Sequence, residues 1–271
     1  MVDVRKKVEE ITPEITQMRV HIHENPELSM KEYNTCALLE DYVKKNVKYD
    51  RLKRVGETGL FFELKGTKPG NGPTIVFRGD IDALPIQEDE HMSPRSKVPG
   101  VMHACGHDVH GTINVGAAKI LSEMKDQFSG SIYFFIQPAE EILQGAKLFL
   151  NDPEIDFDKI DAVAALHVSA ELDAGTIGVR YGAILASADG IRIRINGKGG
   201  HGAHCHTLRD PIVASAAVIN ALQTLVSRET NPANAVVISI CTIHAGEANN
   251  IVPDSVEMTG TVRTLNPADR D

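Results

Sequence analysis

The eight residues from His103 to His110 bring together one cysteine, three histidines and one aspartate. Cys105 and His107 are separated only by Gly106, which has no side chain, so both can turn toward one point in a loop. Thiolate and imidazole are ligands that zinc and related divalent ions favour. The stretch indicates a metal site, although a buried cysteine beside surface histidines explains it equally well when it is taken alone.

Three predicted strands each end in side chains that can bind a metal. Asp80 and Asp82 follow the first, Glu140 and Glu141 the second, and His167 the third. Ligand sites in open α/β sheets form at the carboxyl ends of strands. A solvated helix N-terminus would explain the glutamate pair by itself. The repetition at three strand ends favours a shared site.

These residue types fit metal-assisted hydrolysis. The candidate ligands are Cys105, His107, Glu141 and His167, and Glu140 lies beside them. Two neighbouring carboxylates on a loop point in different directions, so one can bind metal while the other exchanges a proton with water. A divalent ion lowers the pKa of its water toward about 7, and a bridging thiolate would hold two ions roughly 3.5–4 Å apart. The set therefore predicts a hydrolase with two metal ions.

The apolar pattern places these residues on alternating helices and strands. Helices are predicted at residues 2–23, at 31–46 and from the histidine cluster to about 123. Strands are predicted at 58–65, 74–79, 131–136 and 161–166, the last three of them buried. This alternation predicts an α/β fold with a mainly parallel sheet.

The pattern changes after about residue 181. Residues 188–195 alternate as in a half-exposed strand, a helix is predicted at 211–228, and strands follow at 235–244 and 255–264. This order predicts a separate α+β domain whose sheet has one wet face. We therefore expect a catalytic metal-binding domain at 1–183 and a second domain at 184–271.

The last residues predict that the fold is truncated. Asn266 and Pro267 have the pattern of a helix start, but the sequence stops at Asp271. The second domain is therefore expected to be incomplete.

Composition narrows the class of protein. The 271 residues correspond to about two domains. The net charge of −9 comes without a basic stripe, and no apolar run approaches the ~20 residues of a membrane helix, so neither nucleic acid nor membrane is an expected partner. The N-terminus is charged, unlike a signal peptide. Four widely spaced cysteines favour a reducing, cytoplasmic compartment.

Three other interpretations deserve comparison. A cysteine hydrolase using Cys105 with His107 or His110 leaves the glutamate pair and His167 without a role. The glycine spacing at 197–202 fits a dinucleotide fingerprint by letter, but a helix does not begin at once after it. The last is a truncated, non-enzymatic homologue that acts in binding or dimerisation.

The chain resembles the metal-dependent aminoacylase–carboxypeptidase family, in the branch of hippurate hydrolase, auxin-conjugate amidohydrolases and N-acyl-diaminopimelate deacetylase. The matching stretches, in one order along nearly the whole chain, are His23–Leu28, Arg78–Pro85, Met102–Asp108, Gln137–Glu141, Leu166–Val168, Gly199–His204, Asn250–Asp254 and Gly260–Arg263.

The resemblance implies hydrolysis of the amide bond of N-acyl amino acids by a di-metal domain with an inserted, ferredoxin-like lid domain that forms a homodimer. It implies two divalent ions, with zinc or manganese expected before cobalt or nickel. The ligands would be those proposed above, and Glu140 would be the general base.

The resemblance also assigns residues around the metals. Asp82 would orient ligands without binding metal. His201 would reach a neighbouring subunit's site and steady the oxyanion, and Asn250 and Arg263 would hold the substrate carboxylate. Family members supply a last histidine ligand from a further segment, which is absent from this sequence. The resemblance therefore does not imply a second metal ion or activity for these 271 residues alone.

Overall fold

The computed structural model describes residues 3–271. The chain forms two compact units that join between Glu171 and Leu172, here called the N-terminal and C-terminal units. That the N-terminal unit is catalytic and the C-terminal unit is a lid stays a prediction. The helix predicted at residues 2–23 is observed from Val4 to Glu24, and residue 2 lies outside the described residues.

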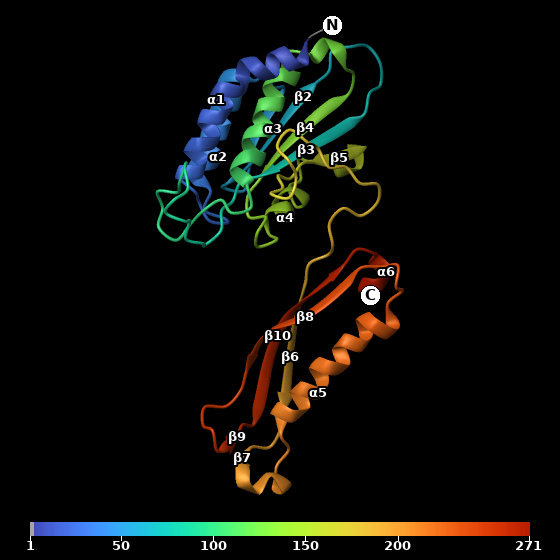
Figure 1. The fold of residues 1–271 in the computed structure, drawn as a ribbon. Helices are drawn as coiled ribbons and strands as arrows, with labels where there is room; N and C mark the ends of the chain where they lie inside the picture. Colours follow the sequence, from blue (N-terminus) through green and yellow to red (C-terminus); the bar gives the residue numbers. More distant parts are fainter. Residues whose placement is uncertain (1–2) are drawn as a thin grey trace. The chain divides into compact units, whose positions relative to one another are not determined.

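A five-stranded sheet forms the centre of the N-terminal unit (Figure 1). Its strands are β1 (Arg51–Val55), β2 (Gly59–Lys65), β3 (Thr74–Asp80), β4 (Ser131–Gln137) and β5 (Ala162–Ala165), in the order β1-β2-β4-β3-β5. β3 is parallel to both β4 and β5. The carboxyl ends of these three strands therefore meet at one edge, as the sequence pattern predicted.

The expectation of a mainly parallel sheet is corrected to a mixed sheet. β1 pairs antiparallel with β2, and β2 pairs antiparallel with β4. β1 is a strand that the sequence pattern missed. It is joined to β2 by a turn of residues 56–58, and so short a connection can only return the chain antiparallel to itself.

Helices cover both faces of this sheet. α1 (Val4–Glu24), α2 (Tyr33–Asn46) and α3 (His107–Ser122) lie together on one face, and α4 (Gly145–Leu150) packs on the other (Figure 1). β2 shows how alternation serves both cores: Leu60, Phe62 and Leu64 join one cluster, and Phe61 joins the other. The sheet is thereby fixed between two apolar layers.

Burial of the strands differs from the expectation. β4 is buried over most of its length, but all four residues of β5 are exposed. In β3, Val76 is buried while Thr74, Ile75 and Phe77 are half-buried. The prediction that 161–166 is buried is wrong because β5 is an edge strand that pairs only with β3.

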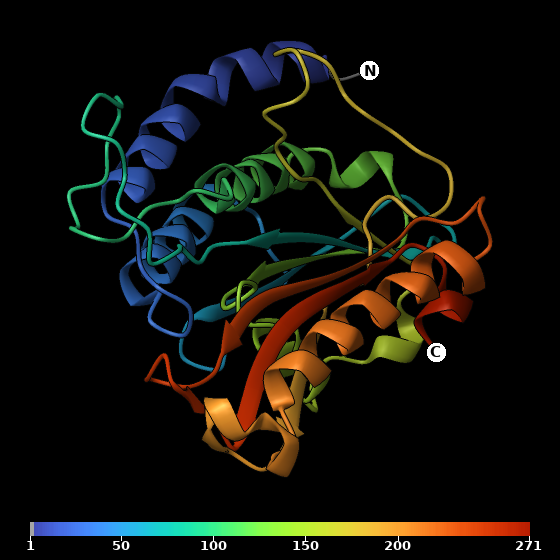
Figure 2. The ribbon, with the colours of Figure 1, turned by 60° about the horizontal axis from the view of Figure 1, so that its bottom comes forward.

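The C-terminal unit is a three-stranded antiparallel sheet with one long helix, as Figure 2 shows. Its strands, in the order β6-β10-β8, are β6 (Asp189–Asn196), β8 (Val236–His244) and β10 (Ser255–Thr264). α5 (Pro211–Thr224) packs along the sheet, where Val256 and Met258 are fully buried. β7 (Gly200–His201) pairs with β9 (Ile251–Val252), and α6 (Pro267–Arg270) follows β10. The predicted β-α-β-β order is thus observed.

Short helical turns complete the described chain: η1 (Lys125–Gln127), η2 (Phe157–Lys159), η3 (Gly202–Thr207) and the π-turn η4 (Leu225–Glu229). Within residues 3–271, no helix has the length and apolar character needed to span a lipid bilayer.

Candidate metal centre

The start of α3 depends on a glycine. Gly106 has φ +89°, in the left-handed region, and directly precedes His107 as the first residue of α3. A Cβ at this position would lie 2.3 Å from Val168 Cγ2, which is closer than atoms can approach. Only glycine satisfies both constraints. The glycine between Cys105 and His107 therefore gives the turn its shape and leaves room for the loop after β5.

Asp82 joins three parts of the site. One of its oxygens lies 3.1 Å from His107 Nδ1, and the carboxylate accepts the backbone N–H of Glu140 at 3.0 Å and of Glu141 at 3.1 Å. Ser29 Oγ donates to it at 2.6 Å. Because Asp82 engages Nδ1 of His107, the other ring nitrogen faces the interior of the site.

A second buried carboxylate supports the glutamate turn. Glu32, which precedes α2, accepts the N–H of Ala139 at 2.8 Å. Ala139 has φ +50°, a conformation that is unfavourable for a residue with a Cβ. Glu32 and Asp82 together thus hold the N–H groups of three successive residues, 139–141. These bonds fix the backbone from which both site glutamates extend.

The predicted ligand atoms converge on one place. Cys105 Sγ lies 3.3 Å from His167 Nε2. His107 Nε2 lies 3.8 Å from Glu141 Oε1 and 3.9 Å from Glu140 Oε2. Two overlapping groups result, Cys105–His107–His167 and His107–Glu140–Glu141, with their ligand atoms within 4.8 Å of one another in each. His107 belongs to both.

Two of these atoms are buried without a hydrogen bond. Among the described residues, neither His107 Nε2 nor Glu141 Oε1 has a partner. Burying a polar atom without a partner costs roughly 1–3 kcal/mol. A cation between them would remove that cost, so the residues present fit a metal ion.

The acidic surroundings shape the pKa values of the site. Burial would lower the pKa of His107, but the Asp82 hydrogen bond and the nearby carboxylates outweigh it and raise the pKa. Burial also raises the pKa of the Cys105 thiol to about 12, and the charges of Glu141, Asp80 and Glu140 add to the effect. This excess of negative charge is the environment in which a divalent cation is stabilised and a thiol is deprotonated by the ion.

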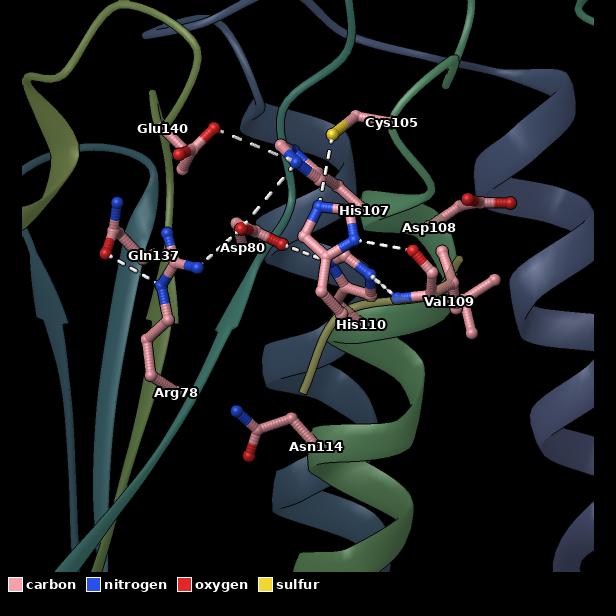
Figure 3. A network of polar contacts seen from close by, with 12 residues as sticks. Arg78, Asp80, Cys105, His107, Asp108, Val109, His110, Asn114, Gln137 and Glu140 are labelled. Atoms are coloured by element: carbon pink, nitrogen blue, oxygen red, sulfur yellow. Dashed lines mark hydrogen bonds and ion pairs between the residues drawn. The ribbon is translucent and has the colours of Figure 1, made fainter. Parts of the chain in front are cut away.

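A third group, Asp80, His107 and His110, shares His107 with the first two, and Figure 3 shows Asp80 and His110 beside that histidine. His110 Nδ1 is 2.6 Å from one Asp80 oxygen, and Arg78 is 2.6 Å from the other. Burial opposes ionisation of Asp80, but the His110 hydrogen bond and the Arg78 charge hold its pKa below its usual range. Asp80 is thus an ionised, fully engaged carboxylate.

The other predicted residues belong to the C-terminal unit. His201 is in β7 and Asn250 directly precedes β9, its partner strand, so the two lie side by side. Arg263 is near the end of β10, about eight residues from its start, or roughly 27 Å at ~3.4 Å per residue. All three side chains are exposed. The structure thus brings His201 and Asn250 together, and it places Arg263 at the far end of β10, where it pairs with Val237 of β8.

Several supporting residues were not among the metal ligands or other site residues predicted for the metal-dependent hydrolase. His110 lies three positions after His107 in a helix, a spacing that puts both on one face and that could have indicated a link. Glu32 carries no such signal, because it comes from a distant helix start. Buried His23 and Asp108 likewise meet only in the folded chain, at 2.9 Å.

Comparisons with known proteins show which family the chain is similar to. The sequence pattern of Peptidase family M20/M25/M40 matches residues 76–263. The chain is 41% identical over 265 residues to Thermostable carboxypeptidase 2 of Saccharolobus solfataricus, covering 97% of this chain and 66% of the relative. It is 38% identical to N-acyl-L-amino acid amidohydrolase of Geobacillus stearothermophilus, covering 97% of this chain and 70% of the relative.

A solved structure is also similar over most of its length. This is a dinuclear metal binding peptidase of Bacillus subtilis, with a TM-score of 0.79 and 35% identity, covering 97% of this chain and 67% of that one. The chain spans about two thirds of the length of the relatives that it matches. The family pattern and these relatives show that this chain belongs to Peptidase family M20/M25/M40.

Proposed function

We propose that this protein hydrolyses the amide bond of N-acyl amino acids with the help of two divalent metal ions. The observation that carries the proposal is a pair of buried atoms, His107 Nε2 and Glu141 Oε1, that lie 3.8 Å apart and have no hydrogen-bond partner among the described residues. The similar proteins include an N-acyl-L-amino acid amidohydrolase and an N-acetyl-L-cysteine deacetylase. Their names support the substrate class.

The metal ligands in this proposal are Cys105, His107, Glu141 and His167. Thiolate and imidazole donors suit zinc and the carboxylate donor suits manganese, so these two ions are proposed before cobalt or nickel. Asp82 binds no metal and instead orients His107 and the glutamate turn. When bound, the ions would polarise the substrate carbonyl and lower the pKa of a water molecule.

Glu140 moves the proton in this scheme. Its carboxylate points toward His107 Nε2 at 3.9 Å, and its backbone is fixed by Asp82. From that position it takes a proton from the attacking water and delivers it to the leaving amine. The hydrogen bonds from the N–H groups of the turn to Asp82 fix the backbone from which this carboxylate extends.

The C-terminal unit is proposed as a ferredoxin-like lid and homodimer interface. His201 Nδ1 accepts the N–H of Ala203 at 3.2 Å, which leaves the ring proton on Nε2, where it can donate to an oxyanion. Asn250 and Arg263 are proposed to bind the substrate carboxylate. Because they lie far apart within one unit, they would share one carboxylate only if they come from two copies.

We also propose a reducing, cytoplasmic location. All four cysteines are free thiols, and Cys105 can bind metal only while it stays reduced.

Metal content and turnover test the proposal together. We expect up to two zinc or manganese ions per chain by mass spectrometry, and release of amino acid from a panel of N-acyl amino acids. Chelation should abolish turnover and metal addition should restore it. A protein that turns over these substrates at the same rate after complete chelation would contradict the metal mechanism. A chain that binds no divalent ion would contradict the site itself.

A cysteine nucleophile is a second candidate, because Cys105 and His167 form a thiol–imidazole contact between distant parts of the sequence. Burial and neighbouring acids raise the pKa of that thiol to about 12, which disfavours the free thiolate that a nucleophile needs. Cys105→Ser distinguishes the two. Lower metal occupancy supports the metal site, whereas full occupancy with loss of a covalent acyl intermediate supports the nucleophile.

A further inference from the structure

The loop that carries His167 has little packing to hold it. It follows β5, an exposed edge strand, and residues 161–170 are all exposed. Burial fixes most core side chains, but here it contributes little. The position of His167 therefore depends on directional contacts, and those contacts lead to His110.

Both ring nitrogens of His110 are engaged. The backbone N–H of Val168 donates to Nε2 at 3.0 Å, so Nε2 must be the acceptor. The ring proton is then on Nδ1, which donates to Asp80 Oδ1 at 2.6 Å. His110 itself is buried at 2% exposure. The imidazole therefore links β3 to the loop after β5 with one fixed tautomer.

The link from β3 through His110 to the loop after β5 is fixed at Asp80, its end on β3. Asp80 also pairs with Arg78, and Arg78 Nε donates to Gln137 Oε1 at 3.0 Å (Figure 3). These bonds connect the carboxyl ends of β3 and β4, the two central strands of this edge. Asp80 cannot turn without breaking them, and so it gives His110 a rigid anchor.

The outer end reaches His167 through a single residue. Val168 uses its N–H for His110, and its carbonyl oxygen accepts from His167 Nδ1 at 2.6 Å. That bond leaves His167 Nε2 free to face Cys105 Sγ at 3.3 Å. The rings of His110 and His167 also meet edge to face, with centroids 4.5 Å apart. The direction of the His167 side chain is thus set through His110.

We propose that His110 is a positioning residue that holds His167 in register with Cys105, with Asp80 as its anchor. Naming His167 a metal ligand rests on the proposed function; the positioning claim does not. Although Asp80, His107 and His110 are close enough to bind an ion, Nδ1 and Nε2 of His110 are already used. The group therefore serves as support and not as a third metal site.

Hydrogen exchange at the Val168 amide tests the positioning without any metal. In the metal-free 271-residue protein, His110→Leu should make this amide exchange at least tenfold faster. His110→Gln, whose side-chain oxygen can still accept from Val168, should restore part of the protection. Asn114→Leu is the matched control, because it removes a buried polar side chain one turn later on α3 that bonds the Phe77 and Phe135 carbonyls and not the loop.

Cobalt titration adds a second readout. Loss of a supporting partner typically weakens metal affinity about 10–100-fold, so His110→Leu should bind cobalt that much more weakly while the thiolate-to-cobalt absorption of Cys105 persists. The proposal would be overturned if the Val168 amide exchanged at the parent rate in His110→Leu. It would also be overturned if Asn114→Leu accelerated that exchange as much as His110→Leu does. If the parent binds no cobalt, the proposed function fails, and the exchange comparison still decides the role of His110.

Discussion

At the scale of single residues, hydrogen bonds to buried carboxylates fix the backbone of the turn that carries the site glutamates. Asp82 and Glu32 capture three successive N–H groups of the turn that carries Glu140 and Glu141. The turn includes Ala139 in an unfavourable conformation. Such a backbone persists only where its surroundings determine it strongly. The backbone that carries the two glutamates is therefore held in place by two buried carboxylates, Asp82 and Glu32.

Glu140→Gln is predicted to keep its metal and lose turnover. A general base contributes about two to four orders of magnitude to a rate, and the amide cannot take a proton. Steady-state kinetics and metal analysis of the same samples measure both properties. Loss of metal from this variant would instead identify Glu140 as a ligand and reverse its assignment with Glu141.

Gly106→Ala is predicted to destabilise the N-terminal unit more than Gly100→Ala. Both glycines have positive φ, so both substitutions carry a backbone strain of roughly 1–2 kcal/mol. Only the Gly106 Cβ meets an atom, Val168 Cγ2, while the Gly100 Cβ has nothing within 4 Å. Denaturant unfolding of both variants gives the difference. Equal losses would show that the loop moves away without cost.

At the scale of elements, a buried polar cluster joins α1 to α3. Asp108, the second residue of α3, lies 2.9 Å from His23 and 2.7 Å from Arg19, both from the last turns of α1. His23 also pairs with Glu88 at 3.0 Å. The cluster adjoins His107 along the chain, so it fixes where α3 begins. The helix that presents His107 is thus held to α1 by charge as well as by apolar packing.

The stability that His23 contributes should fall as the pH rises. The hydrogen bond that His23 donates to Asp108 raises the pKa of His23, against burial and the Arg19 charge. Because the folded pKa is above the unfolded value of about 6.5, the contribution is complete below that pH and is lost as the pH rises through the folded pKa. Unfolding free energies of the parent and His23→Gln, measured metal-free across this range, should converge at high pH. A constant difference would argue against the shift.

At the scale of the whole molecule, the two units are joined by an exposed segment. β5 ends at Ala165 and β6 begins at Asp189, and the residues between them form neither helix nor strand. Ile177 is 89% exposed and Tyr181 is fully exposed. Few contacts oppose the local unfolding that a protease requires.

Limited proteolysis should therefore cut first within residues 172–188 and leave two resistant fragments. Mass spectrometry of the early products identifies the cut. Early cleavage inside α3 or β10 would contradict the division into two compact units. The loop at 86–102 serves as an internal comparison, because it is also largely exposed but returns to the same unit.

The sequence by itself was sufficient where the signal is local. Apolar periodicity predicted β3, β4 and the order of elements in the C-terminal unit, because burial repeats every two or every three to four residues. It also indicated which side chains stand at strand ends. Since β3, β4 and β5 are parallel, those ends do meet, and Glu141 and His167 each lie in a group with His107.

Only the tertiary structure decided which residues support that set. The bonds of Glu32 to Ala139 and of His110 to Val168 join segments far apart in sequence, and no periodicity records such pairs. The exposure of β5 and the mixed sheet were likewise invisible, because an apolar run does not reveal whether its strand has one neighbour or two. Local interactions determine where each helix or strand forms. The neighbours of a strand, in contrast, depend on how the whole sheet assembles.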